Sequence, residues 1–174
     1  MGASGWQYMA PYDGSVEAAL ATAQRRVLAS GEYIWPWETR AEYGVPGDSL
    51  PRPATLDELK AAKDSEDFWE EGTHSILDIE AVVDTTEEPD PYEIDDFGTL
   101  RPLRPERIRH HFGTELPTPD QYAELVARPR RLLPGGDLEE ALTDESGMRW
   151  TGRYVLLYTG DTVSHVGMFG YSGD

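Results

Sequence analysis

The chain has 174 residues, of which 39% are hydrophobic and 28% are charged, and its net charge is −18. This apolar content exceeds that of disordered chains, and the length fits a single domain over residues 1–174. Cysteine is absent, which excludes disulfides, zinc–thiolate sites and thiol nucleophiles, and no apolar run approaches the roughly 18 residues of a membrane-spanning helix.

The N-terminal part predicts a strand followed by a helix. Aromatic and polar residues alternate over residues 5–12 (GWQYMAPY), which is typical of a strand. A helix is predicted over residues 16–29, because Ser15 suits an N-cap, apolar residues follow at helical spacing, and Gly31 suits the position after the helix.

The next segment predicts a loop and a short helix. Residues 33–53 interleave four prolines with tryptophans and glycines, which favours an ordered loop. Thr55 and Glu58 have the spacing of a capping box and predict a helix over residues 56–64.

The middle of the chain predicts a strand, an acidic loop and helical segments. Residues 75–79 (SILDI) favour a strand, although the alternation of polar and apolar residues fails within it. Residues 84–96 are acidic and broken by prolines, as in a surface loop. Helices near 105–111 and over 118–127 follow, and then a weak helical turn at 137–142.

The C-terminal segment 150–171 gives the clearest β pattern, a hairpin that turns at Gly160-Asp161. Val155, Leu157 and Val166 should face inward. The combined elements predict an α+β fold, in which helices cover one face of a mainly antiparallel sheet that includes the hairpin.

Short stretches distributed along the chain have a familiar layout: GWQYMAPY before an amphipathic helix, the central GTHSILDIE, a later FGT, and the closing FGYSGD. Together they resemble a group of small uncharacterised bacterial proteins, typical of actinobacteria and other GC-rich lineages. The resemblance implies a bacterial, soluble protein of one domain, and it implies neither an activity nor a cofactor.

His74 is the candidate catalytic histidine. On a strand it shares one face with Asp78, so it could act as a general base that Asp78 orients; the alternative is a solvated strand face. Glu80 would lie about 20 Å from His74 along a straight strand, too far for one metal ion. His110 and His111 end a predicted helix, where the dipole favours cations. No metal and no cofactor are expected.

The many aromatic side chains either pack the core or line an apolar cleft for a small-molecule ligand or a peptide anchor. Trp150 and the tyrosines of the hairpin add to this excess. The candidates for ligand binding are Trp6, Tyr8, Tyr12, Trp35, Trp37 and Tyr158.

Most of the negative charge lies in residues 57–96, which hold sixteen carboxylates and two lysines for a net charge of −14. Such a field repels nucleic acid and anionic membranes and attracts a basic protein; the alternative is that it serves solubility alone. We expect these carboxylates on one side of the protein. The candidates for partner binding are Glu87, Glu88, Asp90, Asp95 and Asp96.

Two functional hypotheses result. The first is an acidic interaction module that binds or inhibits a basic protein partner, as immunity proteins of bacterial toxins do. The alternative is a small cofactor-free enzyme that tailors a specialised metabolite, with acid–base groups beside an aromatic cleft. The chain has no P-loop, dinucleotide fingerprint or serine elbow, and its N-terminus lacks signal-peptide features, which favours the cytoplasm.

Overall fold

A computed structural model describes residues 4–44 and 49–173. Five strands form one sheet in the order β1-β5-β4-β3-β2. Strand β5 is antiparallel to β1 and β4, whereas β3 is parallel to β4 and β2. The α+β class is confirmed, but the sheet is mixed and the prediction of a mainly antiparallel sheet is wrong. The strands are β1 (Gly5–Pro11), β2 (Ala81–Val82), β3 (Thr99–Pro102), β4 (Thr151–Thr159) and β5 (Thr162–Tyr171).

The two parallel strands have no visible pattern in the sequence. Strand β2 has two residues and β3 has four, too few to show a period of two. Strand β3 also carries a buried arginine, Arg101, where an apolar residue is expected. Its register places Leu100 opposite Gly152 and Arg101 opposite Arg153 of β4.

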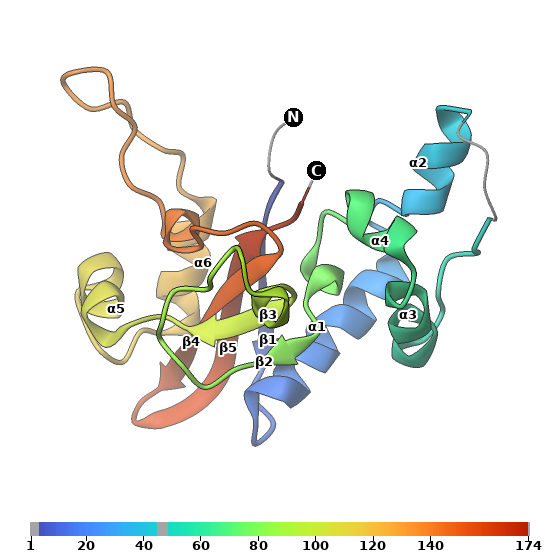
Figure 1. Cartoon of the computed structure of the whole chain (residues 1–174). Coiled ribbons are helices and arrows are strands. Elements are labelled where there is room, and N and C mark those ends of the chain that lie inside the picture. The colour runs from blue at the N-terminus through green and yellow to red at the C-terminus, as the bar shows by residue number, and fades with distance from the viewer. Residues whose placement is uncertain (1–3, 45–48, 174) are drawn as a thin grey trace.

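Helices cover both faces of the sheet (Figure 1), so the expectation of helices on one face is wrong. Strands β4 and β5 are apolar on both sides. Val155 and Leu157 are buried with α6, whereas Val166 is buried with α1 on the opposite face. The helices are α1 (Val16–Ser30), α2 (Pro36–Glu42), α3 (Leu56–Lys63), α4 (Glu66–Glu71), α5 (Pro105–Phe112) and α6 (Pro119–Ala127), with 3-10 turns η1 (Ile76–Asp78), η2 (Ile94–Asp96) and η3 (Leu142–Glu145).

Helix α1 confirms the prediction for residues 16–29 and the reasons for it. The hydroxyl of Ser15 accepts the Ala18 N–H at 3.1 Å, and Gly31 takes the left-handed conformation at φ +70° that ends the helix. The predictions of β1, α3, α5 and α6 are also confirmed, with ends that differ by a residue or so.

The segment expected to be a loop without helix, 33–53, contains α2, so this prediction is wrong. Pro36 occupies the first turn of α2, where its missing N–H costs nothing, and Trp35 and Trp37 are buried on either side of it. Helix α4 follows α3 directly and packs against α2.

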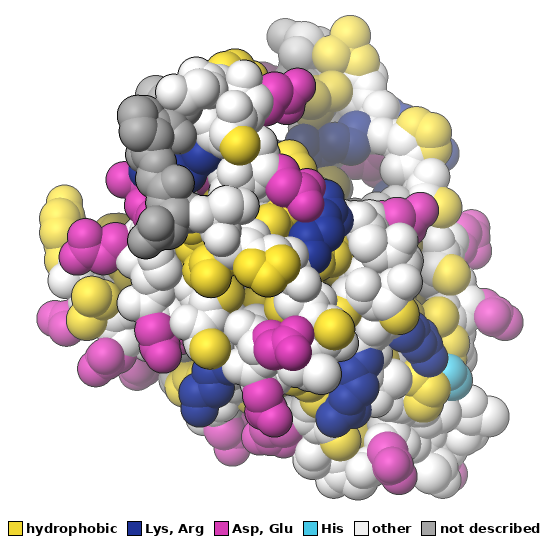
Figure 2. Space-filling model, turned by 90° about the vertical axis from the view of Figure 1, so that its right-hand side faces the viewer, with side chains coloured by type: hydrophobic (Ala, Val, Ile, Leu, Met, Phe, Trp, Pro, Cys, Tyr) yellow, Lys and Arg dark blue, Asp and Glu magenta, His cyan; other side chains and the backbone are white. Residues whose placement is uncertain are grey.

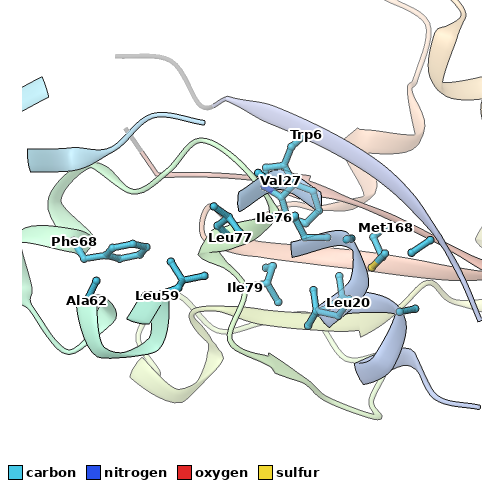
Figure 3. Close-up of a cluster of buried hydrophobic side chains, with 14 of the residues drawn as sticks. Trp6, Leu20, Val27, Leu59, Ala62, Phe68, Ile76, Leu77, Ile79 and Met168 are labelled. Atoms are coloured by element: carbon cyan, nitrogen blue, oxygen red, sulfur yellow. The ribbon is translucent and has the colours of Figure 1, made fainter. Parts of the chain in front are cut away.

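The stretch EEGTHSILDIE does not form the predicted strand, because side chains bind its backbone locally. The Ser75 hydroxyl accepts the Leu77 N–H, and the Asp78 carboxylate accepts the Thr73 N–H at 2.7 Å. These bonds fold the segment into η1. Ile76, Leu77 and Ile79 are all buried against α1 and its neighbours (Figure 3), which explains why the alternation fails.

The C-terminal hairpin is confirmed. Thr159 pairs with Thr162, so Gly160 and Asp161 form a two-residue turn, and Gly160 has a φ of +62°. The helical turn expected at 137–142 is wrong: Leu138 forms an isolated antiparallel bridge with Leu132, and η3 begins only at Leu142.

Candidate functional site

A groove of about 750 Å³ opens between α4, the start of β2 and the end of the acidic loop 84–96. We call it the acidic groove. Segments far apart in the sequence contribute to it, and the fold brings them together beside β2 and β3. The residues that line it are Glu66, Trp69, Glu70, Glu80, Ala81, Ile94, Asp95, Phe97, Thr99 and Trp150.

Two tryptophans form its aromatic wall. The rings of Trp69 and Trp150 have centroids 5.2 Å apart at an angle of 59°. Trp69 Nε1 donates to the Lys63 carbonyl at 2.8 Å. Trp150 has a φ of +63°, unusual for a bulky residue, and a Cβ on Gly72 would lie 2.5 Å from its ring. Gly72 and Gly173 therefore leave the space that this indole occupies.

A second hollow of about 580 Å³ shares Phe97 and Trp150 with the acidic groove. Glu88 and the prolines of the acidic loop form one side of it, and residues 147–149 form the other. The two hollows together make an extended surface on both sides of Trp150.

Three carboxylates of the acidic groove, Glu66, Glu80 and Asp95, are exposed and form no ion pair with any residue in the described ranges. A fourth, Glu70, pairs with Arg40 at 2.7 Å. Aromatic faces and carboxylates both attract cations. The groove therefore suits a cation on an apolar stem, such as an arginine or lysine side chain.

Two buried arginines hold the acidic loop against the sheet. The side chains of Arg101 and Arg153 are 6% and 4% exposed, and they lie opposite each other on β3 and β4. Arg101 pairs with Asp96, and Arg153 donates to Glu88 at 2.5 Å. Both guanidinium groups also donate to the Glu87 carbonyl. The loop therefore neutralises two neighbouring buried cations.

The predicted partner-binding residues consequently have different roles. Glu88 and Asp96 are engaged by Arg153 and Arg101, and Asp90 accepts a backbone N–H of its own loop. Asp95 lines the acidic groove, whereas Glu87 is exposed outside it. Of the sixteen carboxylates in residues 57–96, twelve are exposed. On the face of the molecule in Figure 2, acidic side chains are interspersed with basic and apolar ones.

Asp78 lies directly behind the aromatic wall. It is fully buried, and its Oδ1 accepts hydrogen bonds from the N–H and the hydroxyl of Thr73, both at 2.7 Å. Its Oδ2 has no hydrogen-bond partner in the part of the chain that the structure describes, and it lies 3.1 Å from where a Cβ on Gly72 would be. Burial raises the pKa of Asp78, although the hydrogen bonds from Thr73 oppose this effect.

Lys63 is a buried cation whose charge acts on Asp78. Its Nζ donates to the Ile79 carbonyl at 2.9 Å, and Gln24 donates to the same oxygen at 2.8 Å. Burial lowers the pKa of Lys63 to about 8, while the charges of Asp78 and Glu80 act in the opposite direction.

His74 and Asp78, the candidate catalytic pair, are close in sequence but share no hydrogen bond among those of the described residues. His74 Nδ1 lies 3.0 Å from the Ser4 hydroxyl, and its buried Nε2 has no partner there. The φ of +54° at His74 is a further departure from the expected strand. Neither side chain lines the acidic groove or the hollow beside it.

The predicted ligand-binding aromatics do not gather around one cleft. Three are buried in the core, and Trp6 lies over Gly170, where a Cβ would be 2.5 Å from its ring. The groove instead uses Trp69 and Phe97, together with Trp150. A signal for Trp69 exists in the sequence, since EDFWEE places it among four carboxylates. The buried three are Trp6, Trp35 and Trp37, and the half-buried three are Tyr8, Tyr12 and Tyr158.

Neither the protein-family models, nor the curated proteins, nor the solved structures with which the chain was compared gave a match. Within the described residues, no three histidine or carboxylate side chains are grouped so that they could hold a metal ion. None of the helices in these ranges is both long enough and apolar enough to cross a membrane.

Proposed function

We propose that the protein is an interaction module that binds a basic protein partner in the acidic groove. The observation that carries this proposal is the combination of Glu66, Glu80 and Asp95, none of which forms an ion pair with a described residue, with the wall of Trp69 and Trp150. A volume of about 750 Å³ accommodates more than one side chain of a partner.

The two kinds of lining group would act on different parts of a basic side chain. The methylene stem of an arginine would pack on the indoles, and its guanidinium group would reach the carboxylates at the rim. Aromatic and arginine side chains dominate the energetics of many protein interfaces because they bury large surfaces with directional polar ends. The apolar wall would supply affinity, and the carboxylates would speed association.

The enzyme alternative has less support. Asp78, Thr73 and Ser75 are buried, and His74 is directed to Ser4 rather than to a carboxylate or a tyrosine hydroxyl. A general base needs hydrogen-bond contact with the proton that it removes. The acidic groove offers exposed carboxylates and indoles, which bind cations without further chemistry.

An oligo-arginine peptide is a suitable probe for the groove. We expect the triple variant Glu66→Gln, Glu80→Gln, Asp95→Asn to bind this peptide at least about tenfold more weakly than the parent. Trp150→Ala should also lower the affinity for the peptide. The matched control is Asp13→Asn, Glu32→Gln, Glu124→Gln, which removes the same charge at exposed positions outside the groove.

Stopped-flow tryptophan fluorescence would measure association rates at about 0.05 M and 0.15 M salt. The proposal requires that the groove variant loses affinity and the control keeps it. Equal losses in both triple variants would show that the peptide responds only to net charge, and the groove would then not be the binding site.

A further inference from the structure

A hairpin between α6 and η3 projects from the body of the protein (Figure 1). We call residues 128–139 the finger. The Leu133 N–H donates to the Asp137 carbonyl and the Glu139 N–H to the Arg131 carbonyl, both at 2.7 Å. Arg130 pairs with Asp144 at its base. The finger is therefore a hairpin loop with one antiparallel bridge, held at its base by ion pairs rather than by packing on the core.

The finger exposes apolar side chains that a free surface does not explain. Leu132 is 71% exposed and Leu138 is 55% exposed, and their backbones are bridged across the hairpin. Leu133 at the turn is 44% exposed. An isolated two-stranded hairpin is marginally stable in water, so a covering surface would stabilise it.

The finger also carries a cation beside these leucines. Arg131 is exposed and has no ion pair with a residue of the described ranges, whereas Arg128 and Arg130 pair with Glu139 and Asp144. The finger thus presents a guanidinium group next to apolar side chains. The acidic groove offers the complementary groups, carboxylates beside two indole rings.

We propose that the finger of a second copy of this chain occupies the acidic groove. The inference rests on the proposed function and names the partner at the same site. Leu132 and Leu138 would pack on Trp69 and Trp150, and Arg131 would face the carboxylates of Glu66, Glu80 and Asp95. None of the residues that line the groove belongs to the finger, so the occupant comes from another copy.

Charge complementarity favours this contact over finger-to-finger pairing, which would bring two copies of Arg131 together. A finger–groove contact joins two different surfaces. If the fingers of two copies bind reciprocally in each other's grooves, the contact forms a closed two-fold dimer. If each copy's finger binds the groove of the next copy, the contact forms an open filament.

The test is a complementation of two defective variants. The finger variant is Arg131→Gln, Leu132→Ser, Leu138→Ser, at exposed positions, and the groove variant is Glu66→Gln, Glu80→Gln, Asp95→Asn. Analytical ultracentrifugation would measure the mass of each alone and of an equimolar mixture, at about 0.15 M salt, where repulsion between two acidic chains is screened beyond about 8 Å.

We expect the parent to self-associate and each variant alone to do so at least about tenfold more weakly. The mixture should form a heterodimer, because one intact groove then meets one intact finger. The Asp13→Asn, Glu32→Gln, Glu124→Gln control should self-associate like the parent.

A parent that stays monomeric up to about 1 mM would overturn the inference. Self-association that persists in the groove variant would also overturn it and point to finger-to-finger pairing. Binding of oligo-arginine to the finger variant separates the two proposals. If that peptide binds while the parent remains monomeric, the groove binds a basic protein other than this chain and the proposed function stands. If the peptide does not bind either, both proposals fail.

Discussion

Asp78 and Lys63 are ionisable residues that the fold buries, Asp78 completely and Lys63 with 7% of its surface exposed. The carboxylate of Asp78 is satisfied on one oxygen by Thr73, and the ammonium group of Lys63 relies on the Ile79 carbonyl. Their mutual attraction offsets part of the free energy of desolvation. Because burial shifts both pKa values toward the neutral forms, the stability of the protein should depend on pH through these two groups.

The Lys63→Met substitution tests this dependence. In the parent, Lys63 has a pKa of about 8, against 10.5 for an ordinary lysine. Between these values the unfolded chain binds more protons than the folded one, so the free energy of unfolding rises with pH. Each pKa unit corresponds to about 1.4 kcal/mol. From pH 8 to pH 10.5 the free energy of unfolding of the parent should therefore rise by up to about 3 kcal/mol more than that of Lys63→Met.

Denaturant titrations from pH 8 to pH 10.5 would measure the effect. The control is Lys60→Met, which makes the same substitution at an exposed position of the same helix. Identical pH profiles for the parent and Lys63→Met would contradict the lowered pKa of Lys63.

At the level of elements, helix α1 and the C-terminal hairpin show where reasoning from sequence succeeds, and the segment 73–79 shows where it fails. Caps and periods within one segment predict α1 and the C-terminal hairpin, since Ser15, Gly31 and Gly160 act on their own neighbours. The fold of 73–79 depends on Ser75 and Asp78 binding nearby backbone, which a period of two does not reveal.

The candidate site is less predictable for a related reason. Strand β3 and the groove depend on contacts between segments far apart in the chain. No local pattern around Arg101 predicts that Arg153 lies opposite it, or that Glu88 and Asp96 neutralise the two arginines. Acidic composition alone therefore does not separate the carboxylates that hold the loop from those that remain available to a partner.

The loop offers a direct comparison of these two kinds of carboxylate. Glu88→Gln and Asp96→Asn should each lower the free energy of unfolding by about 1–3 kcal/mol, because each leaves a buried arginine without its counter-ion. Glu87→Gln and Asp95→Asn, at adjacent exposed positions, should change it by no more than about 0.5 kcal/mol. Equal effects of all four substitutions in denaturant titrations would mean that the loop does not depend on Arg101 and Arg153.

For the whole molecule, the excess of negative charge opposes folding by self-repulsion, while the ion pairs that hold the loop are local. The acidic and basic groups are intermixed on one face (Figure 2). The repulsion among exposed carboxylates is long-ranged and screened by salt, whereas the short ion pairs formed by the buried guanidinium groups of Arg101 and Arg153 are screened less.

Salt should therefore stabilise the protein. Raising sodium chloride from about 0.1 M to about 1 M shortens the Debye length from about 10 Å to about 3 Å, so Tm should increase. The increase should be smaller in the groove variant Glu66→Gln, Glu80→Gln, Asp95→Asn, which carries less charge to screen. A Tm in differential scanning calorimetry that falls with salt would show instead that exposed ion pairs dominate over repulsion.

The pairing of β1 with β5 has a consequence for circular permutation of the chain. Gly5 lies opposite Tyr171 in an antiparallel register, so the first and last strands end about 5 Å apart, side by side in Figure 1. A linker of a few residues could join these ends, and new termini could be opened at Gly135 and Gly136 in the turn of the finger. Circular permutation is tolerated best at such exposed loop tips. The permuted chain would keep every strand of the sheet while dividing the finger into two free tails, so that the finger could be removed as a unit without the substitution of a single side chain.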